Sequence, residues 1–228
     1  MTPFAGRFSL LLASWGWAAN AGPTAWRIMP LGDSITQWQC DGESQGGWRN
    51  FLGQSLHAAG VPFAFVGSQY DCGSHEGHSG WTAGQLLALA PSVLPLHNPN
   101  VVMVQCGTND LFFDQGPPGQ NPQGGNATTT RDRISALINS TLTLLPGARV
   151  LVSGVTQINA TRCRDYPQAP WHPLPCPPAM PGAITELNGL LAALPAVYGP
   201  NVTFHDPNPP GGFVSEDYWT WGIHFNER

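Results

Sequence analysis

The sequence contains no lysine, and all nine of its basic residues are arginines. A chain without lysine cannot form a Schiff base through a side-chain amine, and it cannot build a Walker-type phosphate-binding loop. Charge of either sign is scarce, because only 10% of the 228 residues are charged. The arginines are scattered, so they form no basic patch of the kind that binds nucleic acid. We therefore expect no nucleic-acid partner.

The sequence also lacks an apolar run long enough to span a membrane. Its longest apolar stretch near the N-terminus, residues 8–19, follows Arg7 and precedes a small-x-small site at Ala19–Ala21. This arrangement is typical of a cleaved signal peptide, although the same stretch could be a first strand or helix. We predict a signal peptide over residues 1–21, a single domain over 22–228, secretion from the cell and no membrane association. Four N-x-Ser/Thr sequons, at Asn126, Asn139, Asn159 and Asn201, agree with export.

Five cysteines cannot all pair within one chain. Cys163 and Cys176 flank a proline-rich segment that a local disulfide would order. Cys40 and Cys72 lie in two loops that we expect to meet, and we pair them. Cys106 lies inside an apolar run, which predicts a buried free thiol.

Apolar runs alternate with helical patterns along the rest of the chain. The runs, bounded by Gly, Pro or Asn, suit strands buried on both faces, and they cover residues 26–31, 62–67, 101–107, 149–155 and 201–206. The helical patterns cover residues 47–59, 82–97, 130–145 and 181–198. This order predicts an α/β fold, a three-layer αβα sandwich with a five-stranded parallel sheet. Long loops are expected at 68–81, 112–129 and 157–180.

Polar motifs follow the predicted strands. Gly-Asp-Ser comes after the first strand and Gly-Thr-Asn-Asp after the third, so Ser34 and Asn109 should lie at the same edge of the sheet. The end of the chain follows the fifth strand and a loop, so His224 can reach this edge as well. Ser34 has two possible roles at this point, a helix cap or a nucleophile presented by a tight turn.

Four motifs occur in a particular order: "GDSIT" (32–36), "GHSG" (77–80), "GTND" (107–110) and "GIH" (222–224). In this order they resemble the SGNH, or GDSL-type, hydrolases. "IMPLGDSIT" together with "HEGHSGWT" resembles carbohydrate esterase family 3, which contains acetyl xylan esterases. The resemblance covers almost the whole chain after residue 21. It implies the flavodoxin-like SGNH fold and serine-dependent acyl transfer without a cofactor.

The resemblance assigns roles to individual residues. Ser34 would be the nucleophile and His224 the base that takes and returns its proton. The oxyanion hole would consist of the backbone N–H groups of Ser34 and Gly80 and the side-chain amide of Asn109. Each has a purely structural alternative: Ser34 could cap a helix, Asn109 could form a turn, and Gly80 could be an ordinary turn glycine.

Other polar residues near these motifs have supporting roles. We expect Asp33 and Asp110 to bind backbone N–H groups and hold their two turns. His75 and His78 should order the "HEGH" loop by side-chain hydrogen bonds. With Glu76 they could also be read as metal ligands, but the spacing is one residue shorter than the zinc pattern H-E-x-x-H. We therefore expect no metal. A structural calcium can accompany family 3, but no ligand set is readable here.

The sequence departs from the family pattern near its end. The family usually has an aspartate three residues before the histidine, and Trp221 stands at that position. Such an aspartate orients the imidazole. A backbone carbonyl could orient His224 instead, and Asp217 and Glu216 are the nearest acids in sequence. The chain also stops at Arg228, where the family usually continues with a helix, so it resembles a C-terminally truncated member.

These observations predict a secreted, monomeric serine esterase that removes acetyl groups from a polysaccharide. Trp48 and Trp81 follow the loops near the site and could stack on sugar rings, or they could be core residues. Two alternatives remain: a glycan-binding relative with little or no turnover, and a lipase or phospholipase on the same scaffold.

Overall fold

The five apolar runs form neighbouring parallel strands in the computed structural model, which describes residues 25–38, 46–114, 125–161 and 178–208. The strands lie side by side in the order β2 (Phe63–Phe65), β1 (Trp26–Gly32), β5 (Val101–Gln105), β6 (Arg149–Ser153) and β7 (Val202–His205). The predicted α/β class and parallel sheet are thus confirmed.

Two short strands inside the expected loop 68–81 extend the sheet, which has seven strands within the described residues. β3 (Gln69–Tyr70) and β4 (Ser74–Gly77) form an antiparallel hairpin. β4 pairs with the last residues of β1, while β2 pairs with its first residues, so both follow the same edge of β1. The sequence gives little sign of β4, because its four residues are polar or glycine.

The helices occur where the sequence predicted them. They are α3 (Gly47–Ala58), α4 (Ala83–His97), α6 (Ala127–Leu144), α8 (Met180–Ala192) and α9 (Leu194–Tyr198). The last two, α8 and α9, occupy the segment 181–198 that was predicted as a single helix. Two shorter helices, α2 (Ser34–Gln37) and α5 (Thr108–Asp114), were not expected. Each begins just after a strand end that carries one of the polar motifs.

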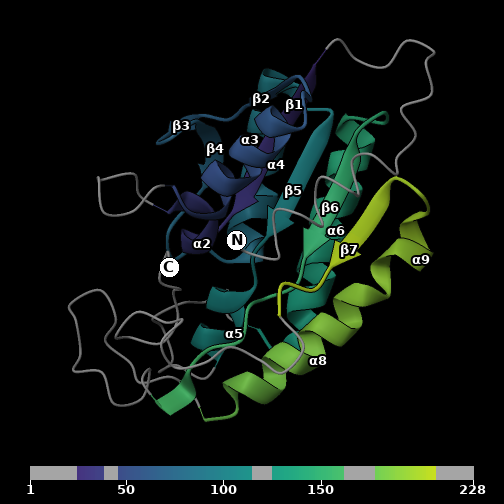
Figure 1. Ribbon diagram of the computed structural model, residues 1–228. Coiled ribbons are helices and arrows are strands. Elements are labelled where there is room, and N and C mark those ends of the chain that lie inside the picture. The colour runs from purple at the N-terminus through teal and green to yellow at the C-terminus, as the bar shows by residue number, and fades with distance from the viewer. Residues whose placement is uncertain (1–24, 39–45, 115–124, 162–177, 209–228) are drawn as a thin grey trace.

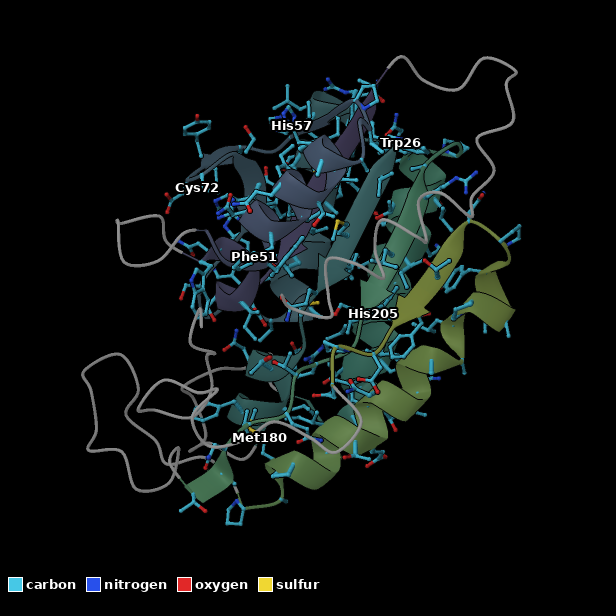
Figure 2. All side chains as sticks on the ribbon, viewed as in Figure 1. Trp26, Phe51, His57, Cys72, Met180 and His205 are labelled. Carbon is cyan, nitrogen blue, oxygen red and sulfur yellow. The ribbon has the colours of Figure 1, made fainter. Side chains whose placement is uncertain are left out.

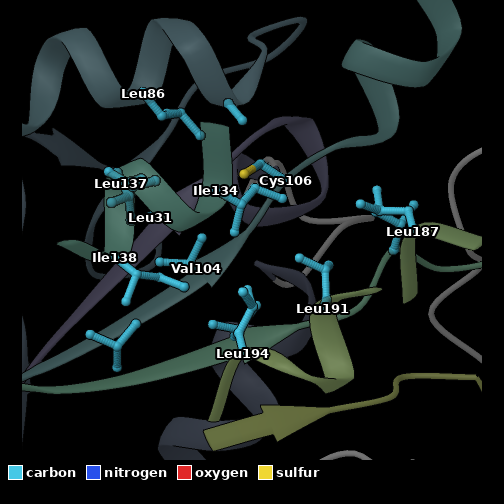
Figure 3. Close-up of a cluster of buried hydrophobic side chains, with 14 of the residues drawn as sticks. Leu31, Leu86, Val104, Cys106, Ile134, Leu137, Ile138, Leu187, Leu191 and Leu194 are labelled. Atoms are coloured by element: carbon cyan, nitrogen blue, oxygen red, sulfur yellow. The ribbon is translucent and has the colours of Figure 1, made fainter. Parts of the chain in front are cut away.

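Helices cover both faces of the sheet and produce the predicted three layers (Figure 1). Along β5, Val102 and Val104 face the cluster formed with α4, α6 and α8, whereas Val101 and Met103 face α3. Side chains that alternate between two buried faces explain why this strand is continuously apolar. Figure 3 shows the larger cluster, in which Leu86, Leu137 and Leu191 come from three different helices.

The cysteines within the described residues are in different states. Cys106 is a free thiol and is buried in the larger cluster (Figure 3), as predicted. Cys72 is exposed and disulfide-bonded, and it lies beside Gly46 at the start of α3 (Figure 2). Cys40, Cys163 and Cys176 fall outside the described residues, so both pairings stay predictions. No helix in the described ranges is long and apolar enough to cross a membrane.

Candidate active site

Three neighbouring strands end at the same level of the sheet. In the register of the parallel pairs, Gly32 of β1 lies opposite Gly77 of β4 on one side and Gln105 of β5 on the other. The segments that follow these strands begin with Asp33, His78 and Cys106. The "GDS", "GHSG" and "GTND" motifs are therefore brought together at one edge, as the sequence predicted for Ser34 and Asn109.

Ser34 is the first residue of the single-turn helix α2, and Asp33 is the N-cap of that helix. The Oδ1 atom of Asp33 accepts a hydrogen bond from the backbone N–H of Ile35 at 3.0 Å. The helix cap, which was one of the two roles considered for Ser34, is therefore provided by Asp33. The half-buried side chain of Ser34 lies at the start of the helix, on the edge of the sheet where ligands bind in this class of fold.

α2 packs directly on the end of β4 because residue 77 is glycine. A Cβ atom at Gly77 would lie 2.5 Å from the Cα atom of Gln37 and 2.7 Å from the carbonyl carbon of Thr36. Real Cβ atoms do not approach backbone this closely, so a larger residue would displace α2. The first glycine of the "GHSG" motif thus fixes the distance between two segments. One is the turn over residues 33–38 that carries Ser34 (the Ser34 turn), and the other is the loop over residues 78–82 that follows β4 (the Gly80 loop).

The loop after β4 is tied to the Ser34 turn by hydrogen bonds. The backbone N–H of His78 donates to the carbonyl of Gly32 at 2.9 Å, and the N–H of Ser79 donates to the side-chain Oε1 of Gln37 at 2.7 Å. These bonds fix the two residues that precede Gly80, which is exposed and has a φ of +79°. A Cβ atom at Gly80 would meet nothing within 4 Å among the described residues, so the space beside it is open.

Asn109 belongs to α5, and its side chain is held against the same loop. Its Nδ2 atom donates to the carbonyl of Trp81 at 2.9 Å. A side-chain amide has two N–H donors, and this bond uses one of them. The Asn109 amide is therefore bonded to the residue that follows Gly80, at the edge that also holds Ser34.

The side chain of Asp110, the residue after Asn109, connects three helices around the site. Its Oδ2 atom accepts from the backbone N–H of Ala83 at 2.8 Å, and its Oδ1 atom accepts from Nη1 of Arg133 at 3.1 Å. The carboxylate thus ties α5 to the start of α4 and to α6. Burial raises the pKa of Asp110, and the N–H of Ala83 and the Arg133 guanidinium oppose that shift.

Asp33 is completely buried and lies near Asp110. Burial, with a smaller contribution from the negative charge of Asp110, raises the pKa of Asp33 to about 7, although the hydrogen bond from Ile35 opposes the shift. The nearby thiol of Cys106 has a raised pKa because it too is buried and faces both carboxylates. Beneath the site, the buried carboxylates of Asp33 and Asp110 thus lie close together, and Arg133 supplies a positive charge that pairs with Asp110.

The "HEGH" residues order their loop through hydrogen bonds. The Nδ1 atom of His75 accepts from the backbone N–H of Gly77 at 3.0 Å, and burial together with nearby Arg49 lowers its pKa to about 4. The buried carboxylate of Glu76 accepts from both the backbone N–H and the hydroxyl of Ser68, and its Oε2 lies 3.1 Å from Nε2 of His78. Within the described ranges, no group of three His, Cys, Asp or Glu side chains is arranged to hold a metal ion.

The two tryptophans near the motifs pack into the protein. Trp48 packs against the cluster under α3, together with Phe63 and Phe65. Trp81 packs against the larger cluster, and its ring stacks on His78 with centroids 4.2 Å apart. These contacts favour the core alternative for Trp48, whereas half-buried Trp81 lies within the loop of the site itself.

The remaining predicted residues, His224 and Asp217, lie outside the described residues, as do Glu216 and Trp221. The base and its orienting group therefore stay predictions. Sequence reasoning missed Gln37, which anchors the Gly80 loop, and Arg49, which contacts the carbonyls of α2. A signal for Arg49 was present, because it shares the helical spacing of the buried residues Leu52 and Leu56.

Comparisons with known proteins agree with this geometry. The model of the GDSL-like lipase/acylhydrolase family matches residues 31–228. Among solved structures, a family 3 carbohydrate esterase of Clostridium thermocellum is 28% identical, with a TM-score of 0.64 and coverage of 90% of this chain and 89% of that one. A family 3 carbohydrate esterase from Talaromyces cellulolyticus is 23% identical, with a TM-score of 0.62 and coverage of 88% of each chain.

A lipase/acylhydrolase from Enterococcus faecalis has the same fold, with 19% identity, a TM-score of 0.62 and coverage of 89% and 88%. No curated protein sequence matches the chain significantly. The family match spans all four motifs and most of the chain. The chain therefore belongs to the GDSL-like lipase/acylhydrolase family and is an ester hydrolase of the SGNH type.

Proposed function

We propose that this ester hydrolase is a secreted serine esterase that removes acetyl or other short acyl groups from carbohydrate through an acyl-enzyme on Ser34. The observation that carries the proposal is the strand register, in which Gly32 lies between Gly77 and Gln105. This register supports a common site for Ser34, Gly80 and Asn109, because each residue follows one of these strand ends.

The reaction runs in two steps. The Oγ atom of Ser34 attacks the ester carbonyl while His224 takes the hydroxyl proton, and the same imidazolium then protonates the departing sugar oxygen. The acyl group is now an ester of Ser34. His224 next takes a proton from water, which attacks this ester, and collapse of the second intermediate releases the acid and returns the proton to Ser34.

Charge develops on the carbonyl oxygen in both tetrahedral intermediates. The backbone N–H groups of Ser34 and Gly80 and the Asn109 amide stabilise this oxyanion. Their positions are supported by the bond from Ser79, the residue before Gly80, to Gln37, and by the bond from Asn109 to Trp81. Donors fixed before the reaction need no reorganisation, and removing one typically lowers turnover by about a hundred- to a thousandfold.

The substrate class rests on the structural neighbours. The esterase of Clostridium thermocellum at 28% identity is a family 3 carbohydrate esterase, and this supports an acetylated carbohydrate as the substrate. The N-terminal residues 1–21 and the four sequons support secretion. N-terminal sequencing of the exported protein should find Gly22 as its first residue, and retention of the protein inside the cell would contradict secretion.

The test of catalysis is Ser34→Ala. We expect this change to lower the hydrolysis of p-nitrophenyl acetate by at least about a thousandfold, because the proposed acyl-enzyme forms on this hydroxyl. The control is Ser92→Ala, whose hydroxyl donates to the carbonyl of Leu89 within α4 and whose loss should leave turnover unchanged. Equal activity of Ser34→Ala and the unaltered protein would contradict the proposal.

The same assay separates the proposed substrate from the alternatives. Rates should fall from acetyl to butyryl to octanoyl esters, and acetate should be released from acetylated xylan. Rates that rise with acyl length would favour a lipase. Binding of xylan without any Ser34-dependent hydrolysis would favour a glycan-binding relative.

A further inference from the structure

Arg49 is a buried charge with an unusual set of partners. It lies in α3, its side chain is completely inaccessible to solvent, and no carboxylate lies within ion-pair distance of it among the described residues. Burial lowers its pKa to about 10, so it remains positively charged at neutral pH. A buried charge is costly unless it is fully hydrogen-bonded, so its partners show what it holds.

All five N–H donors of the guanidinium bind backbone carbonyls. Nε donates to Thr36 at 2.8 Å, and Nη2 donates to Gln37 at 2.7 Å and Trp38 at 3.0 Å. Nη1 donates to Asp71 at 2.7 Å and Gly73 at 3.3 Å. Because arginine has five such donors in a rigid fork, this set uses the side chain completely.

The first three carbonyls belong to the C-terminal end of α2. A four-residue helix cannot be stable alone, because nucleation of a single turn costs more than its few hydrogen bonds return. Its N-terminal end is fixed by Asp33, and its C-terminal carbonyls are fixed by Arg49. A cation is also favourable at this end of a helix. The turn that presents Ser34 is thus held at both ends by buried side chains.

The other two carbonyls flank Cys72 in the turn between β3 and β4. One guanidinium therefore joins the Ser34 turn to the hairpin whose second strand leads into the Gly80 loop. Gln37 continues this link, since its carbonyl accepts from Arg49 and its side chain accepts from Ser79. The segments that carry Ser34 and Gly80 are therefore linked to the same cation through Gln37.

We propose that Arg49 is a positioning residue for the esterase reaction, whose guanidinium sets the orientation of Ser34 relative to the Gly80 loop by binding the carbonyls of α2 and of the β3–β4 turn. This proposal rests on the proposed function of Ser34. Arg49 does not touch the reacting atoms. Its loss should therefore slow the chemical step more than it weakens substrate binding.

The test is Arg49→Lys in the full chain. Lysine keeps the charge but has three donors in place of five, so some carbonyls of α2 or the hairpin lose their partner. We expect kcat for p-nitrophenyl acetate to fall about ten- to a hundredfold with KM within about twofold, as for an interaction realised in the transition state. The rate at which p-nitrophenyl diethyl phosphate phosphorylates Ser34, with release of p-nitrophenolate, should fall in parallel.

Arg27→Lys is the matched control. Arg27 also binds helix-terminal carbonyls, those of His97 and Asn98 at the end of α4, but α4 does not carry Ser34. We expect kcat of this variant to remain within about twofold of the unaltered protein. Near-UV circular dichroism and thermal unfolding establish that both variants are folded under the assay conditions.

The outcomes separate this proposal from the proposed function. Loss of hydrolysis in Ser34→Ala with unchanged kcat in folded Arg49→Lys would overturn the role of Arg49 alone. Unchanged kcat in Ser34→Ala would overturn the proposed function, and the role of Arg49 with it. If neither Arg49→Lys nor Arg49→Gln folds at any temperature, Arg49 serves the whole fold and not the Ser34 turn, which also overturns the proposal.

Discussion

Asp33 combines two properties that oppose each other. Its carboxylate caps α2 through the N–H of Ile35, and this bond favours the charged form. Its complete burial and the neighbouring Asp110 favour the neutral form, and the pKa of about 7 shows that burial prevails. The residue next to the proposed nucleophile therefore titrates close to neutral pH.

The titration of Asp33 makes a prediction about stability. Because its pKa is raised on folding from 3.8, its stabilising contribution is complete below about pH 4 and is lost as pH rises through about 7. The loss is at most on the order of 4 kcal/mol, at about 1.4 kcal/mol per pKa unit. Asp33→Asn keeps an N-cap acceptor but does not titrate. We expect the Tm of the unaltered protein to fall more steeply between about pH 4 and 8 than that of Asp33→Asn.

Comparison of the two pH profiles isolates Asp33. His75 has a lowered pKa of about 4, and its contribution is lost in the opposite direction, as pH falls below its ordinary value of 6.5. Both proteins retain His75, so its effect cancels in the difference between their Tm values. Parallel profiles would show that Asp33 does not change its charge in this range.

At the scale of elements, the close contact between α2 and β4 depends on residue 77 being a glycine, which has no side chain. Gly77→Ala places a Cβ atom against the backbone of Gln37 and Thr36, which cannot move aside as a flexible side chain could. We expect this change to displace α2, to lower the unfolding free energy by about 2–3 kcal/mol, and to lower kcat for p-nitrophenyl acetate. Urea unfolding and steady-state kinetics measure the two effects.

Gly189→Ala in α8 is the control for Gly77→Ala. A Cβ atom at exposed Gly189 would meet nothing within 4 Å among the described residues. Alanine is the better helix former, so we expect a gain of about 0.5–1 kcal/mol in unfolding free energy with unchanged kcat. A comparable loss of stability in both variants would mean that the close approach at Gly77 is unimportant.

Hydrophobic patterns predicted the long elements correctly and the short ones poorly. β5 and β6 were clear from their continuous apolar runs, and α3, α4 and α6 from their helical spacing. β4, α2 and α5 have four, four and seven residues, too few for a period to be recognised. These short elements exist because neighbouring segments bind them, and that is why local sequence did not reveal them.

At the scale of the whole molecule, the larger core cluster holds the helical layer on the sheet, and it meets the site at residues such as Trp81 and Cys106. Leu137 of α6 is fully buried in this cluster (Figure 3). We expect Leu137→Ala to lower the unfolding free energy by about 2–5 kcal/mol, because it removes buried carbon atoms and leaves a cavity. At temperatures well below its Tm, its kcat should remain close to that of the unaltered protein.

The control for Leu137→Ala comes from the same helix. Leu144 is 37% exposed, so Leu144→Ala removes less buried surface than Leu137→Ala and should lower the unfolding free energy by only about 1 kcal/mol. Denaturant unfolding of the two variants makes the comparison. If kcat falls as much in Leu137→Ala as in Gly77→Ala, the expectation that Leu137 affects stability without affecting turnover is wrong.

The sequence by itself determined the fold class and the main residues of the candidate site. Apolar runs separated by amphipathic segments indicated a helix-covered parallel sheet, and the resemblance of the motifs to those of SGNH hydrolases marked Ser34, Gly80 and Asn109 as candidates. These properties are local, because hydrophobic period and motif spacing are visible within a few residues.

Only the tertiary structure decided how the site is held. Asp33 rather than Ser34 caps α2, Gly77 sets the approach of that helix to β4, and Arg49 binds carbonyls from two segments more than 20 residues apart in sequence. Each of these functions depends on which backbone groups a residue meets after folding. A sequence does not indicate which backbone carbonyls will accept such hydrogen bonds, because every residue has a backbone carbonyl.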